Sequence, residues 1–160
     1  MIIAFSGHAD IASKNKIKEM VKKEIKNHIT PFEPITCYLG GYGDFDQICA
    51  HACKELKEEF PRIELIYVSP YMSLSEQEKI KWLQNNGFCD ASIYPPIENT
   101  PPKFAISKRN QWMMENANLI IAYVKRNYGG AYQSLQLAKR KKKRIINICD
   151  LIDSHAESLI

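Results

Sequence analysis

Short apolar runs alternate with longer amphipathic stretches along the whole chain. The runs cover about five residues each, and they lie at residues 2–6, 35–39, 63–68, 119–124 and 144–148. Runs of this length and composition are typical of strands that are buried on both faces. We therefore expect five strands at these positions.

Between the runs, apolar residues recur three or four positions apart, as on one face of an α-helix. In residues 13–29, for example, Ile17 and Val21 share such a face. Ser75 followed by Glu78 indicates a capping box at the start of a later helix. Further helices are expected over residues 45–60, 75–85, 104–117 and 131–142.

Strands and helices that alternate in this way predict an α/β fold. We expect a Rossmann-like three-layer α/β/α domain whose mostly parallel sheet has about five or more strands. Residues 87–102 are proline-rich and predict a loop with a short strand at 91–94. A short helix is expected after Asp150. No repeat or linker divides the chain, so residues 1–160 are interpreted as a single domain.

The cysteines bear on the cellular compartment. The chain has five of them, an odd number without CxxC spacing, which argues against a disulfide framework and a zinc ribbon. We interpret them as buried small hydrophobic residues of a protein in the reducing cytoplasm. No apolar run approaches the roughly 20 residues of a membrane span, so no membrane partner is expected. The apolar N-terminus lacks a basic segment and is interpreted as a strand.

The net charge of +4 is modest, and much of it lies in the run KRKKKR, residues 139–144. This run follows an expected helix, where cations interact favourably with the helix dipole. A solvated helix end is the preferred interpretation, and a contact with nucleic acid is the alternative. No aromatic residues interrupt the run, although such residues are needed to stack bases.

Candidate chemistry lies in the turns that follow the expected strands. In YLGGYGDFDQ, glycines at Gly40, Gly41 and Gly43 permit a sharp turn and a close approach to a ligand. The helix that follows offers free amides that suit a phosphate. Asp44 or Asp46 could cap this helix or hold a ribose hydroxyl. A tight turn without a ligand is the alternative.

Three further segments extend the predicted ligand site. The first expected strand ends in FSGH, and NYGGAYQS repeats the glycine doublet after a later strand. Arg109 has a guanidinium that can grip a phosphate with two parallel bonds. A structural role is favoured for His8 over acid–base catalysis. A further turn, SPY at residues 69–71, follows the expected strand at 63–68. The predicted ligand-binding residues in these segments and in the SPY turn are Ser6, Gly7, His8, Ser69, Pro70, Tyr71, Arg109, Asn110, Gly129, Gly130 and Ala131.

No catalytic constellation is recognisable. The chain lacks a nucleophile-elbow serine, the HExxH pattern and the phosphate loop GxxxxGK[ST]. The dinucleotide fingerprint GxGxxG is not matched either. We therefore predict no catalytic residue, no metal and no cofactor.

Taken together, the motifs FSGH, LGGYGDFDQICAHA, VSPY, KRNQWMMENANLIIAYV and GGAYQSLQLAKRKKKRIIN resemble those of the SLOG superfamily. It groups the DprA-like DNA-processing proteins with the Lonely Guy phosphoribohydrolases. The chain is most similar to the small YpsA/YoqJ-like bacterial and phage branch, from Ile2 to about Ile148. The resemblance implies a nucleotide or nucleotide-derived ligand over the glycine turns. The positions that match are Gly40, Gly41, Gly43, Asp46, Arg109, Met113, Gly129 and Gly130.

The last motif departs from the Lonely Guy pattern GGxGTxxE. Tyr132 replaces a glycine, Gln133 replaces the threonine, and Gln136 replaces the glutamate. The resemblance implies that this glutamate takes part in cleaving the N-glycosidic bond in Lonely Guy enzymes. An amide cannot act as a carboxylate acid or base. Hydrolysis by that route is therefore not expected.

Three functions remain open. The preferred one is a sensor or sequestering protein that binds an ADP-ribose-like or cyclic-nucleotide signal without catalysis. The first alternative is a phosphoribohydrolase or a deoxyribosyltransferase-like N-glycosidase, with Asp46 or Glu115 as a substitute carboxylate. The second is a DprA-like nucleic-acid-binding module that uses residues 139–144. A homo-oligomer, a dimer or larger, is also expected, with Phe104 and Trp112 as interface candidates if they are not core residues.

Overall fold

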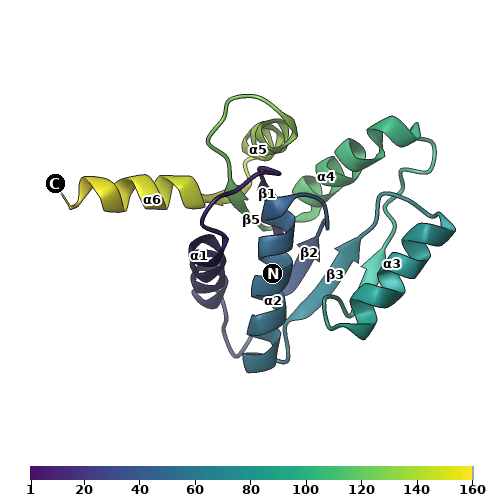
Figure 1. Cartoon of the computed structure of the whole chain (residues 1–160), viewed down its shortest axis with the longest axis horizontal. Helices are drawn as coiled ribbons and strands as arrows, with labels where there is room; N and C mark the ends of the chain where they lie inside the picture. Colours follow the sequence, from purple (N-terminus) through teal and green to yellow (C-terminus); the bar gives the residue numbers. More distant parts are fainter. Residues whose placement is uncertain (160) are drawn as a thin grey trace.

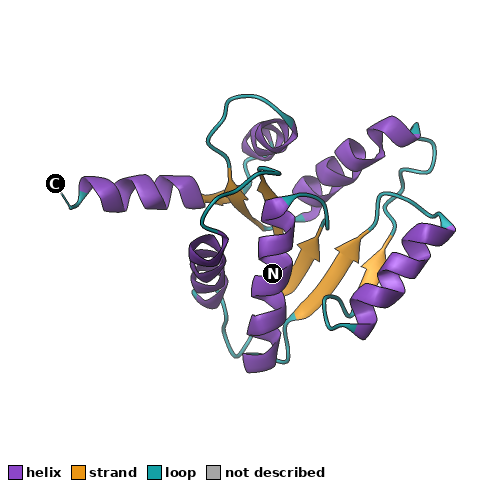
Figure 2. Ribbon diagram, viewed as in Figure 1, coloured by secondary structure: helices purple, strands orange, loops and turns teal. Residues whose placement is uncertain are grey.

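The fold is built on one parallel sheet. The computed structural model describes residues 1–159. Every pairing in the sheet is parallel, and the strand order is β4-β3-β2-β1-β5-β6 (Figure 2). The six strands are β1 (Ile2–Gly7), β2 (Thr36–Leu39), β3 (Glu64–Val68), β4 (Ala91–Ile93), β5 (Leu119–Tyr123) and β6 (Arg144–Asn147).

Helices cover both faces of this sheet (Figure 1). One core cluster joins α1, α2, α3 and α6 to alternate strand residues such as Ile3 and Phe5, and the other joins α4 and α5 to the intervening ones, such as Ala4. Alternate residues of a strand point to opposite faces, which explains this division. The helices are α1 (Lys14–Lys26), α2 (Asp44–Glu59), α3 (Leu74–Asn85), the 3-10 turn η1 (Pro102–Phe104), α4 (Ala105–Asn116), α5 (Gly130–Arg140) and α6 (Ile148–Glu157).

The direction of the chain through the sheet reverses beside β1. The chain runs from β1 through β2 and β3 to β4, and then crosses over to β5, which pairs with the other side of β1. The two crossover paths therefore leave a crevice between β1 and β5 at their carboxyl ends. Ligands of open α/β sheets bind at such a switch point.

These observations confirm the predicted three-layer α/β/α architecture, including the short strand in the proline-rich segment and the short C-terminal helix. The five cysteines are free and buried, as expected. Every helix within residues 1–159 is too short or too polar to span a bilayer.

The capping box predicted at Ser75 is wrong. Helix α3 begins at Leu74, and Ser73 is its cap, because the Ser73 hydroxyl accepts a hydrogen bond of 3.3 Å from the amide of Glu76. Ser75 lies inside the first turn instead. Two serines that are two residues apart offer equivalent cap signals, and the contact of Glu76 with the core decides between them, since Tyr67 donates a 2.6 Å hydrogen bond to its carboxylate.

Gly7 is required by packing. A methyl group added at Gly7 would lie 2.3 Å from the ring of Phe45, which is fully buried and has no room to move. We predict that Gly7→Ala lowers the free energy of unfolding by about 1–3 kcal/mol, the usual cost of overpacking a core. Urea unfolding followed by circular dichroism measures this change.

Gly130→Ala is the matched control. An added methyl group at Gly130 meets no described atom within 4 Å, and the residue opens α5. Alanine is the better helix former, so this variant should be as stable as wild type or slightly more stable. Equal losses in the two variants would contradict the packing explanation.

Candidate functional site

A small pocket of about 100 Å³ lies at the switch point. Its walls come from the end of β1, the turn between β2 and α2, and the facing sides of α4 and α5. The polar residues among its lining are Ser6, Tyr42, Asp46, Arg109, Asn110 and Ser134. We call this space the inner pocket.

Arg109 forms the buried end of the inner pocket and is fully buried. Its Nη1 donates hydrogen bonds to the carbonyl oxygens of Gly40, at 2.8 Å, and Val68, at 2.6 Å. Its Nε donates to Oδ1 of Asn110 at 2.9 Å. Its Nη2 is also buried and has no hydrogen-bond partner among the described residues. The side chain is thus fixed by three bonds and keeps unused donor capacity.

The position of Arg109 follows from the helix that carries it. Ala105, Arg109 and Met113 recur every four residues on the buried face of α4, so Arg109 takes a place that an apolar residue would normally fill. Burial lowers its pKa, but a guanidinium stays protonated in proteins. A buried cation is costly unless an anion or hydrogen-bond acceptors compensate it. The free Nη2 is therefore suited to bind an anionic or acceptor group.

Asp46 supplies the opposing carboxylate. Its Oδ2 accepts a 2.9 Å hydrogen bond from the amide of Tyr42. Removal from water raises the pKa of Asp46 from 3.8 to about 6, although the Tyr42 amide and the charges of Arg109 and Lys79 act in the opposite direction. Asp46 is therefore mostly ionised at neutral pH and takes up a proton in mild acid.

Gly40 allows these two groups to reach the same pocket. A methyl group added there would lie 2.9 Å from Oδ2 of Asp46 and 3.4 Å from Nη2 of Arg109. The described residues nevertheless show no ion pair within 4.0 Å between Asp46 and Arg109. The two charged groups therefore lie on either side of the site without forming an ion pair with each other.

Tyr42 covers this charged pair from the solvent side. Its ring centroid lies 5.5 Å from the guanidinium carbon of Arg109 and 4.1 Å from Nζ of Lys79. Cations at such distances from an aromatic face are attracted by the ring. Burial is the main reason that the pKa of Lys79 is lowered. Tyr42 stands between two predicted glycines, so the expected turn already contained it.

The amino end of α5 forms another wall. Gly129 is the N-cap with φ of +92°, a conformation that glycine adopts readily, and its helix has no side-chain cap within the described part of the chain. Gly130 and Ala131 line the inner pocket, and the Ser6 hydroxyl donates to the carbonyl of Ala131 at 3.4 Å. Uncapped amides and the positive end of the helix dipole favour an anion here.

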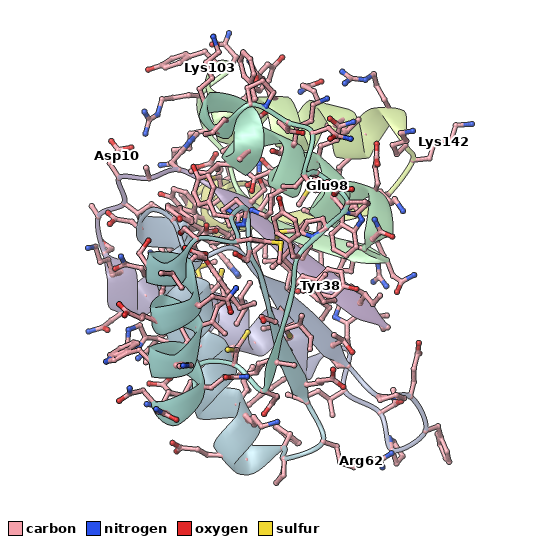
Figure 3. All side chains as sticks on the ribbon, turned by 90° about the vertical axis from the view of Figure 1, so that its right-hand side faces the viewer. Asp10, Tyr38, Arg62, Glu98, Lys103 and Lys142 are labelled. Atoms are coloured by element: carbon pink, nitrogen blue, oxygen red, sulfur yellow. The ribbon has the colours of Figure 1, made fainter. Side chains whose placement is uncertain are left out.

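The inner pocket opens into a larger groove of about 470 Å³ between α4 and α5. The two spaces share Ile106, Asn110, Gly130 and Ser134. Lys103 and Arg140 line the outer groove, and Lys103 lies in η1, directly before α4 (Figure 3). A ligand can therefore lie across exposed cations while one of its groups reaches Arg109.

The pocket thus brings together seven predicted site residues and five that the prediction lacked. The seven are Ser6, Gly7, Asp46, Arg109, Asn110, Gly130 and Ala131. The others are Phe5, Tyr42, Ile106, Met114 and Ser134. Gln136 lines neither space, whereas Gln133 lines the outer groove.

His8 stabilises the turn that precedes α5, next to the inner pocket. Its Nε2 accepts hydrogen bonds from the amides of Lys125, at 2.9 Å, and Arg126, at 3.3 Å. Burial, followed by the charge of Arg126, lowers the pKa of His8 and keeps the ring neutral. His8 thus fixes the turn before α5, which is a structural role.

The SPY turn also has a structural role here. The Ser69 hydroxyl lies 2.9 Å from Oε1 of Glu76 and 2.7 Å from the carbonyl of Tyr71. It joins the end of β3 to α3, and Pro70 is buried in the same turn. None of Ser69, Pro70 and Tyr71 lines the inner pocket.

Neither Asp44 nor Asp46 caps α2, so that alternative for the two aspartates is wrong. Gly43 is the N-cap, with no side-chain cap among residues 1–159. Asp44 turns toward the loop after β1, where its Oδ2 accepts a 2.8 Å hydrogen bond from the amide of Ile11. Gly43 packs closely on Ala9, and Gly41 packs on Tyr67. These residues shape the turn from outside the pocket.

Two solved structures share this architecture. Against DNA processing protein A from Helicobacter pylori, the TM-score is 0.59 at 18% sequence identity, over 91% of this chain and 63% of that one. Against DNA processing protein A (DprA) from Streptococcus pneumoniae, the TM-score is 0.61 at 18% identity, over 89% of this chain and 48% of that one. The fold of the chain is similar to that of the matched part of DprA. The chain spans between about half and two thirds of these DprA chains.

The DprA likeness confirms the fold that the sequence resemblance implied. No protein-family model and no curated protein sequence matches the chain. The YpsA/YoqJ-like assignment therefore stays a prediction.

Asp46 makes stability depend on pH. Because its folded pKa is above 3.8, the ionised carboxylate opposes folding, and stability falls as the pH rises from about 4 through about 6. The difference corresponds to at most about 3 kcal/mol. We predict that Asp46→Asn becomes the more stable protein relative to wild type as the pH rises from 4 to 7. Urea unfolding at several pH values tests this.

Glu98→Gln, at an exposed loop position, is the control and should follow the wild-type profile. Parallel profiles for all three proteins would contradict the raised pKa of Asp46.

Proposed function

We propose that the chain binds single-stranded nucleic acid in the α4–α5 groove, by which we mean the outer groove together with the inner pocket at its closed end. One phosphate would lie at the amino end of α5, within reach of Arg109. The observation that supports this most directly is the buried, unpartnered Nη2 of Arg109 at the closed end of a groove whose outer part carries Lys103 and Arg140.

The small inner pocket and the exposed outer groove favour a polymer that lies across the surface. Pockets that enclose a whole small molecule usually offer about 300–1,000 Å³. The inner pocket, at about 100 Å³, has room for one chemical group of a ligand. The outer groove has exposed residues along its length, including Lys103, Ser107, Gln133 and Arg140, so the rest of the ligand would remain near solvent.

The DprA likeness gives independent support. The Helicobacter pylori structure is described as showing a single-stranded DNA binding mode of that protein. A chain with the same fold, and with cations at the carboxyl edge of its sheet, is a reasonable candidate for the same class of ligand. This support favours nucleic acid over the small signalling nucleotide that the sequence analysis preferred.

A small nucleotide-derived ligand is the second candidate, and Asp46 favours it. A carboxylate beside the anion site repels a phosphate, but it is a good acceptor for a ribose hydroxyl. A mononucleotide would place its phosphate at α5 and its sugar toward Asp46. Displacement of bound oligonucleotide by low concentrations of mononucleotide would favour this candidate.

Binding of single-stranded DNA tests the proposal. Fluorescence anisotropy with labelled oligothymidine should show binding that weakens steeply between roughly 50 and 200 mM salt. Each phosphate contact contributes about 0.7 to the slope of log K against log salt for single strands. The double variant Lys103→Ala/Arg140→Ala should reduce that slope by about 1.4.

Lys16→Ala/Lys23→Ala is the charge-matched control. Both lysines are exposed on α1, which packs on the opposite face of the sheet. This variant should bind like wild type. Absence of binding at low salt, or equal losses in both double variants, would overturn the proposed groove.

A further inference from the structure

A second surface lies at the amino ends of the strands, opposite the candidate site, and includes the loop between α1 and β2. Phe32, in this loop, has 91% of its surface exposed, the largest fraction among the exposed large hydrophobic residues of the described chain. Single exposed apolar residues are common, but this one stands beside a hollow apolar surface.

The loop holds Phe32 outward. Pro31 and Pro34 flank the residue and restrict the backbone. Nη1 of Arg62 donates to the carbonyl of Pro31 at 3.4 Å, and the Thr30 hydroxyl accepts a 3.2 Å hydrogen bond from the amide of Glu33. The exposed ring is therefore presented by a braced turn, which lowers the entropy cost of binding.

The hollow beside it has a volume of about 360 Å³. Its walls are mainly apolar, and they include Ile29, Pro34, Ile35, Phe60, Pro61 and Ile63. We call it the basal pocket, because Ile35 and Ile63 directly precede β2 and β3 at the amino ends of the strands. Its volume is ample for one aromatic side chain.

The patch is complementary to itself. A two-fold contact requires one surface to carry both the projecting group and the cavity that receives it, and Phe32 and the basal pocket meet this condition. The rim also carries both signs of charge. Arg62 has no carboxylate partner in the described part of the chain, while Glu33 and Glu59 line the same rim and each pair with one cation of their own chain, the N-terminal amine and Lys26 respectively. A second copy rotated by a two-fold axis can place carboxylates opposite Arg62.

We propose that two copies of this chain associate through this patch, with Phe32 of each copy in the basal pocket of the other. The contact differs from the oligomer interface expected at Phe104 and Trp112. It also lies away from the α4–α5 groove: Arg62 and Lys103 mark opposite ends of the molecule (Figure 3). The α4–α5 groove of each copy stays accessible in this dimer. The dimer is therefore proposed independently of the ligand.

Sedimentation equilibrium over a range of protein concentrations tests this dimer. Wild type should show a monomer–dimer equilibrium, and Phe32→Ala should weaken it by at least about tenfold, as expected for a central aromatic anchor. Pro61→Glu, which leaves Phe32 in place and puts a carboxylate at the basal pocket, should weaken it similarly.

Phe104→Ala is the control, because Phe104 is also exposed but lies beside the α4–α5 groove. It should dimerise like wild type. Circular dichroism and urea unfolding should show all variants folded, since exposed positions contribute little to stability. A wild type that stays monomeric at its highest soluble concentration, or a Phe32→Ala variant that dimerises normally, would falsify the proposal.

Discussion

The guanidinium of Arg109 is the interaction around which the candidate site is arranged. By donating to the carbonyl groups of Gly40 and Val68, it ties the ends of β2 and β3 to α4, a helix from the far side of the long crossover. Buried carbonyl groups require hydrogen-bond donors, and Arg109 supplies one to each of these two. The same residue therefore closes the fold and provides the free donor of the pocket.

The sequence predicted the sheet well because buried parallel strands have a strong local signature. Five apolar runs became β1, β2, β3, β5 and β6, and the three-layer order followed from their alternation with helices. The groove could not be predicted in the same way. It forms where α4 and α5 pack side by side, and residue spacing does not reveal which helix faces meet. Ile106 and Ser134 were missed for this reason.

The glycines show a second limit of sequence reasoning. Their clustering in turns correctly indicated the carboxyl edge of the sheet, but each one serves a different need. Gly7 makes room for Phe45, Gly40 makes room for Asp46 and Arg109, and Gly129 adopts a positive φ. Only the packed structure distinguishes these causes, because a glycine in a sequence carries no information on what its missing side chain would touch.

The hydrogen bonds of His8 have a consequence for the proposed site. Two backbone amides donate to Nε2, so the ring is held as the neutral tautomer with its proton on Nδ1. Burial lowers the pKa of His8, which favours this neutral state, whereas burial raises the pKa of Asp46 to about 6. A neutral ring thus holds the turn before α5, while the carboxylate of Asp46 on the other side of the pocket gains a proton in mild acid. Acidity can therefore change the charge of the cavity, and with it the ligands that the cavity prefers.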